Sequence, residues 1–361
     1  MLCTSPALAI EAPPPRTDPV RNSEWHLRYL KADQAQRHAT GAGVTVAVPD
    51  TGIALHPDLR KNLLPGLDTT NNKAGDGRRD LDGHGTGMAG LIAAHGGPGN
   101  TGILGIAPEA KLLPIRGKER SEGGNTEDLA AGIDFAIEHG ADVISISAAA
   151  GADIRLQQAI RAAIQANIVV VAAAGNTTES SIVEYPASSP DVIAVGGIDR
   201  NGNRAAISVS GPEIDVVAPA VDIYSTGING GYRVGTGTSD ATAIVAGAAA
   251  LIRSKYPDLP AQEVAHRLTA TAIDKGPPGR DDEYGYGVID LVAALTADVP
   301  PLGFESPSVT APTSTAAHNN SDDNSTARGL ATLGVLLAAG GGYLVWRRRR
   351  RAGDPPPRIS R

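Results

Sequence analysis

Cysteine and aromatic residues are scarce in this sequence of 361 residues. The single cysteine, Cys3, excludes a disulfide bond within the chain, so thiol content does not indicate a redox compartment. Phe, Trp and Tyr together make up 3% of the residues, against a hydrophobic content of 41%. The core must therefore be built mostly from Ala, Val, Ile and Leu, which is typical of a parallel sheet covered by helices.

Sequence motifs for metal and nucleotide chemistry are also missing. The chain contains no HExxH motif, so nothing in it indicates zinc. Residues 41–43, Gly-Ala-Gly, precede an expected strand, whereas a dinucleotide fingerprint must follow one. Asp76, Asp80 and Asp82 crowd one loop but lack the alternating ligand spacing of a calcium loop. We therefore predict no metal site and no cofactor, with calcium at this loop as the weaker alternative.

Positive charge is concentrated at the C-terminal end of the chain. The residues after Trp346 hold seven arginines and one aspartate, whereas the whole chain has 32 basic and 39 acidic residues and a net charge of −7. The rest of the chain is therefore more acidic than the net charge indicates. This balance argues against nucleic acid as a partner.

A long hydrophobic run precedes this basic end. Residues 329–346 carry no charge and are followed directly by the five arginines at 347–351. As a helix the run would span about 27 Å, close to the roughly 30 Å hydrocarbon core of a membrane. We predict a transmembrane helix here, because the three consecutive glycines at 340–342 would weaken the alternative, a buried core helix.

The flanking segments predict how the chain is oriented in the cell membrane. The arginine block favours a cytoplasmic tail, residues 347–361, and an extracytoplasmic N-terminal domain on a single-pass anchor. Residues 298–328 are rich in Pro, Ser, Thr, Ala and Asn and are typical of an extended stalk. Residues 1–23 resemble a leader remnant with an N-terminal extension, in which residues 7–9 match a signal cleavage site. We expect the gene product to begin upstream of Met1, the competing interpretation being a tail-anchored protein with a cytoplasmic domain.

Between these segments, residues 24–297 alternate short apolar runs with helical patterns, which predicts an α/β domain with a mainly parallel central sheet. The expected strands are residues 44–48, 111–115, 143–147, 168–173, 192–195 and 214–217. The expected helices are residues 84–95, 126–139, 154–166, 239–256 and 261–271. Functional groups in such folds gather at the carboxyl ends of strands and at helix N-termini.

Four such junctions hold polar groups that could hydrolyse a peptide bond. They are Asp50 at the end of VAVPD, His84 in DGHGTGMAG, Asn176 at the end of VVVAAAGN, and Ser239 in GTGTSDATA. Taken singly, each has a structural interpretation: an Asx turn, a structural histidine, a turn and a helix cap. Taken together, they supply an orienting carboxylate, a base, an oxyanion donor and a nucleophile.

The blocks DTG, HGTGMAG, AAGN and GTSDATA resemble, in this order, the four signature blocks of the subtilisin-like serine proteases. The stretch EWHLRYLKADQA, the stalk and the single C-terminal span resemble the mycosins, the subtilases associated with type VII secretion. The resemblance implies a subtilisin-like three-layer domain with Asp50, His84 and Ser239 as the catalytic triad. It also implies that Asn176 is the oxyanion donor, that the substrate is a polypeptide, and that the type VII secretion membrane complex is a partner.

The stretch SISAAAG, residues 145–151, lies where the family's substrate-binding strand normally has Ser-Leu-Gly. By this resemblance, the segment with Ser145, Ser147, Ala148 and Ala149 pairs with the substrate backbone. The shape of the pocket does not follow from the family, because two alanines replace the usual Leu-Gly.

Other positions depart from the family pattern. Ala243 and Ile244 stand where the family has Pro and often His, and Gly87 stands where a second histidine is common. Asp240, directly after Ser239, is more unusual. We expect its carboxylate to point to solvent, the alternative being that it biases the base toward its protonated form.

The sequence thus predicts a membrane-anchored serine endopeptidase that cleaves exported polypeptides through an acyl-enzyme. The alternative is a structural or docking subunit of the secretion complex in which proteolysis is dispensable. The physiological substrate, the cleavage preference and the oligomeric state do not follow from the sequence.

Overall fold

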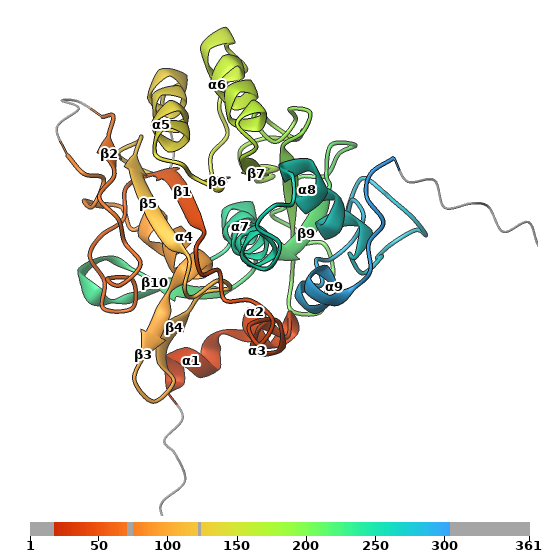
Figure 1. Cartoon of the computed structure of the whole chain (residues 1–361), viewed down its shortest axis with the longest axis horizontal. Coiled ribbons are helices and arrows are strands. Elements are labelled where there is room, and N and C mark those ends of the chain that lie inside the picture. The colour runs from red at the N-terminus through yellow and green to blue at the C-terminus, as the bar shows by residue number, and fades with distance from the viewer. Residues whose placement is uncertain (1–17, 71–74, 122–123, 304–361) are drawn as a thin grey trace, which may run out of the picture. The chain divides into compact units, whose positions relative to one another are not determined.

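Seven strands form a central sheet in the order β2-β5-β1-β6-β7-β8-β9 (Figure 1). The computed structural model describes residues 18–70, 75–121 and 124–303, which belong to one unit of the chain, Met1–Phe304. Every pairing in this sheet is parallel. The strands are β1 Thr45–Asp50, β2 Leu67–Asp68, β5 Lys111–Arg116, β6 Val143–Ile146, β7 Val169–Ala173, β8 Ile193–Ile198 and β9 Val216–Pro219.

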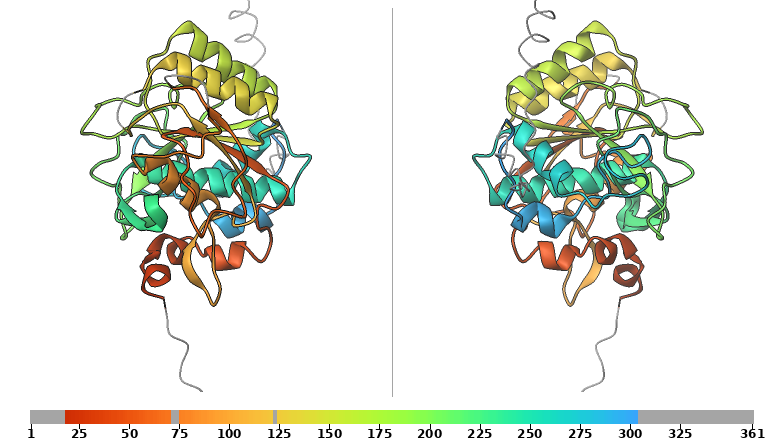
Figure 2. Two further views of the ribbon diagram at one scale, coloured as in Figure 1. Left: turned by 90° about the vertical axis from the view of Figure 1, so that its left-hand side faces the viewer. Right: turned by 90° about the vertical axis from the view of Figure 1, so that its right-hand side faces the viewer.

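Helices cover both faces of this sheet, so the unit has three layers. α5 and α6 lie side by side over one face, and α4 and α7 pack together on the opposite face (Figure 2). Strands β6 to β9 are buried along their whole length, as a sheet covered on both faces requires. The larger helices are α4 His84–Ala93, α5 Thr126–Glu138, α6 Ile154–Gln165, α7 Thr238–Lys255 and α8 Ala261–Ala270.

Helix α7 is the central helix of the core and is made mostly of small residues. It contacts β6, β7, β8 and β9 as well as α4. A Cβ atom on Gly247 would lie 2.7 Å from the Cβ of Ile106, so only glycine allows this close approach. The scarcity of aromatic residues therefore matches a core in which helix and sheet lie close together.

The six expected strands and five expected helices are all confirmed, with ends that differ by a few residues. β1 extends through Asp50 rather than ending at Val48. The elements that the sequence did not predict are short: α1 Pro19–Ser23, α2 Trp25–Tyr29, α3 Ala32–Ala35, α9 Leu291–Thr296, η1 Ile228–Gly230, β2, the hairpin β3 His95–Gly97 with β4 Thr101–Leu104, and the hairpin β10 Ile223–Thr226 with β11 Tyr232–Gly235.

The predicted membrane segment lies outside the described residues. Within residues 18–70, 75–121 and 124–303, no helix combines the length and apolar character needed to cross a membrane. The expected span at 329–346, the basic tail and all but the first residues of the expected stalk at 298–328 are not described. The membrane anchor and the domain boundaries therefore stay predictions.

Candidate active site

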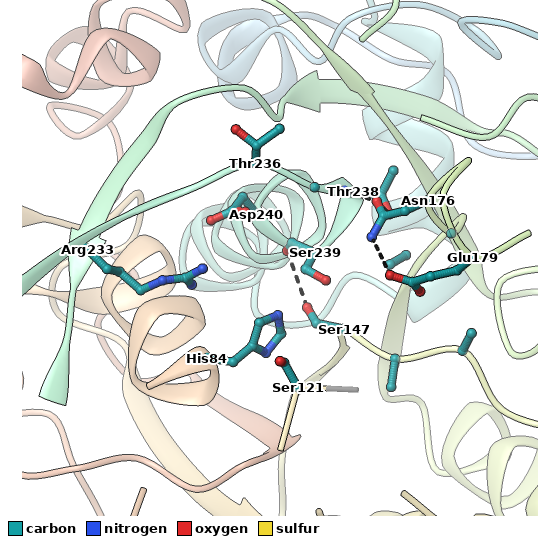
Figure 3. Close-up of a pocket in the computed structure, with 15 residues that line it drawn as sticks. His84, Ser121, Ser147, Asn176, Glu179, Arg233, Thr236, Thr238, Ser239 and Asp240 are labelled. Carbon is teal, nitrogen blue, oxygen red and sulfur yellow. Dashed lines mark hydrogen bonds between the residues drawn. The ribbon is translucent and has the colours of Figure 1, made fainter. Parts of the chain in front are cut away.

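One end of the sheet gathers the four residues predicted for catalysis. Asp50 is the last residue of β1, and His84 is the first residue of α4. Asn176 follows β7, and Ser239 lies in the first turn of α7. His84, Asn176 and Ser239 line one cleft with a volume of about 420 Å³ (Figure 3). The structure thus brings these side chains together from four separate stretches of the chain.

Asp50 and His84 form a buried hydrogen-bonded pair. His84 Nδ1 lies 2.8 Å from Asp50 Oδ1, which also accepts a 2.7 Å bond from the backbone N–H of Thr51. Asp50 is 1% exposed, and the side chain of His84 is 13% exposed. Because an ionised carboxylate only accepts, this contact places the proton of a neutral imidazole on Nδ1 and leaves Nε2 as a base.

The electrostatic surroundings of Asp50 keep it ionised. Burial by itself raises the pKa of this carboxyl. The positive charges of His84 and Lys118, with the hydrogen bonds from His84 and Thr51, outweigh burial and hold the pKa well below its usual range. The carboxylate is therefore negative at neutral pH and can stabilise an imidazolium.

Lys118 is a charged neighbour of this pair that sequence analysis missed. Its side chain is 5% exposed, and Nζ lies 3.5 Å from Asp50 Oδ2. The ammonium also donates 3.2 Å hydrogen bonds to the carbonyl oxygens of Ser121 and Ser147. The register of β1 against β5 pairs Asp50 with Arg116, so a lysine just beyond that position was the available signal.

Ser239 presents its hydroxyl to the cleft and does not cap the helix. The N-cap residue of α7 is Gly237, which has no side chain to make a capping bond. The backbone carbonyl of Ser239 accepts a 3.2 Å bond from the Ser147 hydroxyl. The Ser239 hydroxyl has no hydrogen bond to another described residue, and the His84 ring faces the same cleft (Figure 3). The structural interpretation of Ser239 as a cap is therefore wrong.

The side-chain amide of Asn176 is held in one orientation by α7. Its Oδ1 accepts bonds from the backbone N–H of Thr238 at 3.1 Å and from the Thr238 hydroxyl at 3.2 Å. The amino group is thereby directed toward the cleft, where Nδ2 donates a 3.3 Å bond to Glu179 Oε1 (Figure 3). Asn176 consequently offers an N–H donor beside Ser239.

Only part of the segment expected to bind substrate lines the cleft. Ser147, Ala148 and Ala149 line the cleft, at the carboxyl end of β6. Ser145 lies within β6, is 1% exposed and is not among the residues that line the cleft. The small side chains of the two alanines leave this wall of the cleft open.

Asp240 does not point to solvent, so that expectation is wrong. The residue is 2% exposed, because the chain at the end of β11 packs against it: a Cβ on Gly235 would lie 2.5 Å from Asp240 Oδ1. Burial raises the pKa of Asp240 to about 6, although the charges of Arg233 and His84 oppose this rise. Sequence alone could not show that β11 covers the first turn of α7.

The aspartate-rich loop before His84 is organised by its own hydrogen bonds. Asp80 Oδ1 accepts from the backbone N–H groups of Asp82 and Gly83, and Oδ2 accepts from the N–H and hydroxyl of Thr86. Gly83 has φ +95°, a left-handed conformation that favours glycine. These contacts fix the start of α4 and so the position of His84. Within the described parts of the chain, no group of three or more His, Cys, Asp or Glu side chains is placed to hold a metal ion.

This geometry defines a class of enzyme. A buried carboxylate bonded to an imidazole, a serine at a helix start and an amide donor in one cleft are the groups of a serine hydrolase. Their order along the chain is Asp, His, Ser, on a fold with a parallel sheet. The same order and groups occur in subtilisin.

Comparison with known proteins shows the family. The family model described as the Subtilase family matches residues 41–287, and the chain belongs to this family. Subtilisin DY from Bacillus licheniformis is 41% identical over 276 residues, covering 75% of this chain and 97% of that protein. Mycosin-1 from Mycobacterium tuberculosis is 36% identical over 334 residues, covering 77% of this chain and 74% of that protein.

A solved structure supports the same relationship. The crystal structure of MycP1 from the ESX-1 type VII secretion system superposes with a TM-score of 0.70 at 33% identity, covering 78% of this chain and 88% of that one. The chain is therefore a subtilisin-type serine endopeptidase related to the mycosins.

Proposed function

We propose that the protein is a membrane-anchored endopeptidase that cleaves exported polypeptides through an acyl-enzyme on Ser239. The observation that carries the proposal is the buried hydrogen bond between Asp50 and His84. His84 lines the same cleft as Ser239. An imidazole held in this way is a base for a neighbouring hydroxyl.

In the proposed reaction, Ser239 Oγ attacks the carbonyl carbon of the scissile bond while His84 Nε2 takes the hydroxyl proton. The resulting imidazolium is stabilised by the Asp50 carboxylate. Asn176 Nδ2 donates to the oxygen that becomes negative in the tetrahedral intermediate. His84 then gives its proton to the leaving amine, and a water molecule hydrolyses the acyl-enzyme by the same steps.

The segment from Ser147 to Ala149 is proposed to bind the substrate backbone on the acyl side. Ser147, Ala148 and Ala149 follow β6, outside its pairing in the sheet, and line the same cleft as Ser239. An extended peptide can pair with such a segment through main-chain hydrogen bonds.

A function in type VII secretion is supported by the similarity to Mycosin-1 and to MycP1. The uncharged run at 329–346 and the arginines after it support a single-pass anchor with the catalytic unit outside the cytoplasm. Proteinase added to intact spheroplasts should remove the catalytic unit and spare the arginine tail. A protected catalytic unit would contradict this topology.

A serine-directed fluorophosphonate tests the assignment of the nucleophile. The protein should be labelled, and Ser239→Ala should abolish labelling without unfolding the protein. Ser121→Ala is the matched control, since Ser121 lines the same cleft and should leave labelling intact. Persistent labelling of the Ser239→Ala protein would overturn the assignment. If the variant lost labelling while secretion continued, the protein would instead act in secretion as a docking subunit.

A further inference from the structure

Apart from the buried Asp240, the charged side chains that line the two ends of the cleft differ in sign. Arg233 lies at one end and Glu179 at the other, with His84 and Ser239 between them (Figure 3). Asn176, which bonds Glu179, marks the end at which the substrate carbonyl oxygen binds in the proposed reaction. A substrate lying across Ser239 therefore meets a positive charge on one side of the scissile bond and a negative charge on the other.

The end with Arg233 is the leaving-group side. His84 must deliver a proton to the leaving amine, so the chain that departs lies beside the imidazole. Arg233 comes from β11 and extends over the first turn of α4, where a Cβ on Gly87 would collide with its guanidinium. Gly87 lies one helical turn after His84, so the guanidinium lies on the His84 side of Ser239.

The guanidinium of Arg233 is not neutralised by a direct contact. Arg233 is half-buried and lines the cleft, but its Nη1 is buried without a hydrogen-bond partner in the part of the chain that the structure describes, so a substrate can reach only the other N–H groups of the guanidinium. Asp240 attracts it electrostatically, but no ion pair within 4.0 Å joins these two described residues. Asp240 Oδ1 is itself buried without a hydrogen-bond partner. A planar donor of this kind binds carboxylates with paired hydrogen bonds.

We propose that Arg233 binds the carboxylate of an acidic residue directly after the scissile bond, so that the enzyme prefers Asp or Glu at this position. The proposal rests on the endopeptidase function proposed above and specifies part of its substrate class. The absence of a side chain at Gly87 provides the space that the guanidinium occupies.

Cleavage mapping tests this preference without a known substrate. Denatured casein is digested with the protein, the cleavage sites are mapped by mass spectrometry, and the best site is resynthesised with Glu, Gln or Lys after the scissile bond. We expect kcat/KM for the Glu peptide to exceed that for the Gln peptide about tenfold, as one charge-assisted contact provides. The Lys peptide should be the poorest, and added salt should reduce the Glu to Gln ratio.

Variants at Arg233 assign the preference to this side chain. In Arg233→Gln the Glu to Gln ratio should fall to about one, and in Arg233→Glu the Lys peptide should become the best of the three. The ratio is compared within each variant, so a general loss of activity cancels. Arg60→Gln is the matched control, because Arg60 is exposed and does not line the cleft.

The outcomes separate this inference from the proposed function. The wild-type protein could cleave peptides with a Glu to Gln ratio of about one, or with a ratio that Arg233→Gln does not change. Either result would overturn the proposed preference at Arg233 and leave the endopeptidase function intact. If no peptide is cleaved and Ser239 is not labelled, the proposed function itself fails. Should Arg233→Gln fail to fold, a salt-independent ratio in the wild-type protein overturns the subsite.

Discussion

Lys118 Nζ lies 3.5 Å from Asp50 Oδ2, the carboxylate oxygen that does not bond to His84. The buried carboxylate is therefore held between an imidazole and an ammonium. Lys118 also binds the carbonyl oxygen of Ser147, in the segment that lines the cleft. One lysine thus connects the charge of the Asp50–His84 pair to the wall on which the substrate backbone is proposed to bind.

Replacing Lys118 with Met should destabilise the protein. Removal of the ammonium leaves a buried carboxylate oxygen without a partner, so we expect a loss of about 3 kcal/mol in the free energy of unfolding. The charge of Lys118 also helps to hold the pKa of the Asp50 carboxyl well below its usual range, so this carboxylate is the group that loses stabilisation. Denaturant unfolding at neutral pH measures the loss.

Lys111→Met is the matched control for this experiment. Lys111 begins the same strand, β5, but is exposed, and its ammonium donates to the carbonyl of Lys61. Its replacement should change stability by no more than about 0.5 kcal/mol. Equal stability of Lys118→Met and Lys111→Met would show that Lys118 does not stabilise the Asp50 carboxylate.

Asn176→Ala should lower turnover about 10² to 10³-fold with little change in KM, because the amide is needed mainly when the oxyanion forms. The structural basis is the orientation of this amide by Thr238. Steady-state kinetics on one peptide measure the change. Glu179→Ala is the control, since it removes the partner of Nδ2 and keeps the donor. An unchanged turnover number in Asn176→Ala would show that another group supplies the oxyanion contact.

The main elements of the fold could be predicted because each is marked by local sequence. The six predicted strands of the central sheet are mainly apolar runs, and the side chains of Asn125 and Asp153 cap the N-termini of α5 and α6. The hairpin of β10 and β11 was missed because the apolar residues of β11, Tyr232 and Val234, are exposed, whereas its inward residues are Arg233 and Gly235. No apolar alternation toward the core therefore marks this strand in the sequence.

The residues of the site divide in the same way. Asp50, His84, Asn176 and Ser239 lie at the ends of predicted elements, so their proximity follows from the sheet. Lys118 and Arg233 were missed because their contacts depend on tertiary packing. Lys118, just after the neighbouring strand β5, contacts Asp50, and Arg233, in the β10–β11 hairpin, packs over Gly87. The error on Asp240 has the same cause, since β11 buries it.

Glu24 should make the folded protein less stable as the pH rises from about 4.5 to about 8. Burial raises the pKa of this carboxyl to about 8 from 4.5, against the charge of Arg21 and the hydrogen bond from the Leu104 backbone. A raised pKa in the folded protein means that the stabilising contribution is complete below about 4.5 and lost as the pH rises through about 8. Glu24→Gln keeps an acceptor for Leu104 and should make stability less dependent on pH across this window.

Thermal unfolding of both proteins at several pH values between about 5 and 9 measures this effect. The difference in stability between Glu24→Gln and the wild-type protein should move in favour of the variant as the pH rises. Glu138→Gln, at an exposed position at the end of α5, should leave the pH dependence unchanged. A constant difference between Glu24→Gln and wild type would mean that Glu24 does not titrate in this range.

Burial of Asp240, the residue after the nucleophile, should also make the stability of the protein depend on pH, in a lower pH range. Its pKa is raised from 3.8 to about 6 by burial, so its contribution to stability is complete below about 3.8 and lost as the pH rises through about 6. Asp240→Asn stays neutral, and relative to wild type it should gain on the order of 2 kcal/mol between about pH 4 and pH 7. Denaturant unfolding at both pH values measures the gain, with the exposed Asp258→Asn as the control. Equal gains in the two variants would show that Asp240 is ionised throughout, because the attraction of Arg233 and His84 then outweighs the burial of the carboxylate.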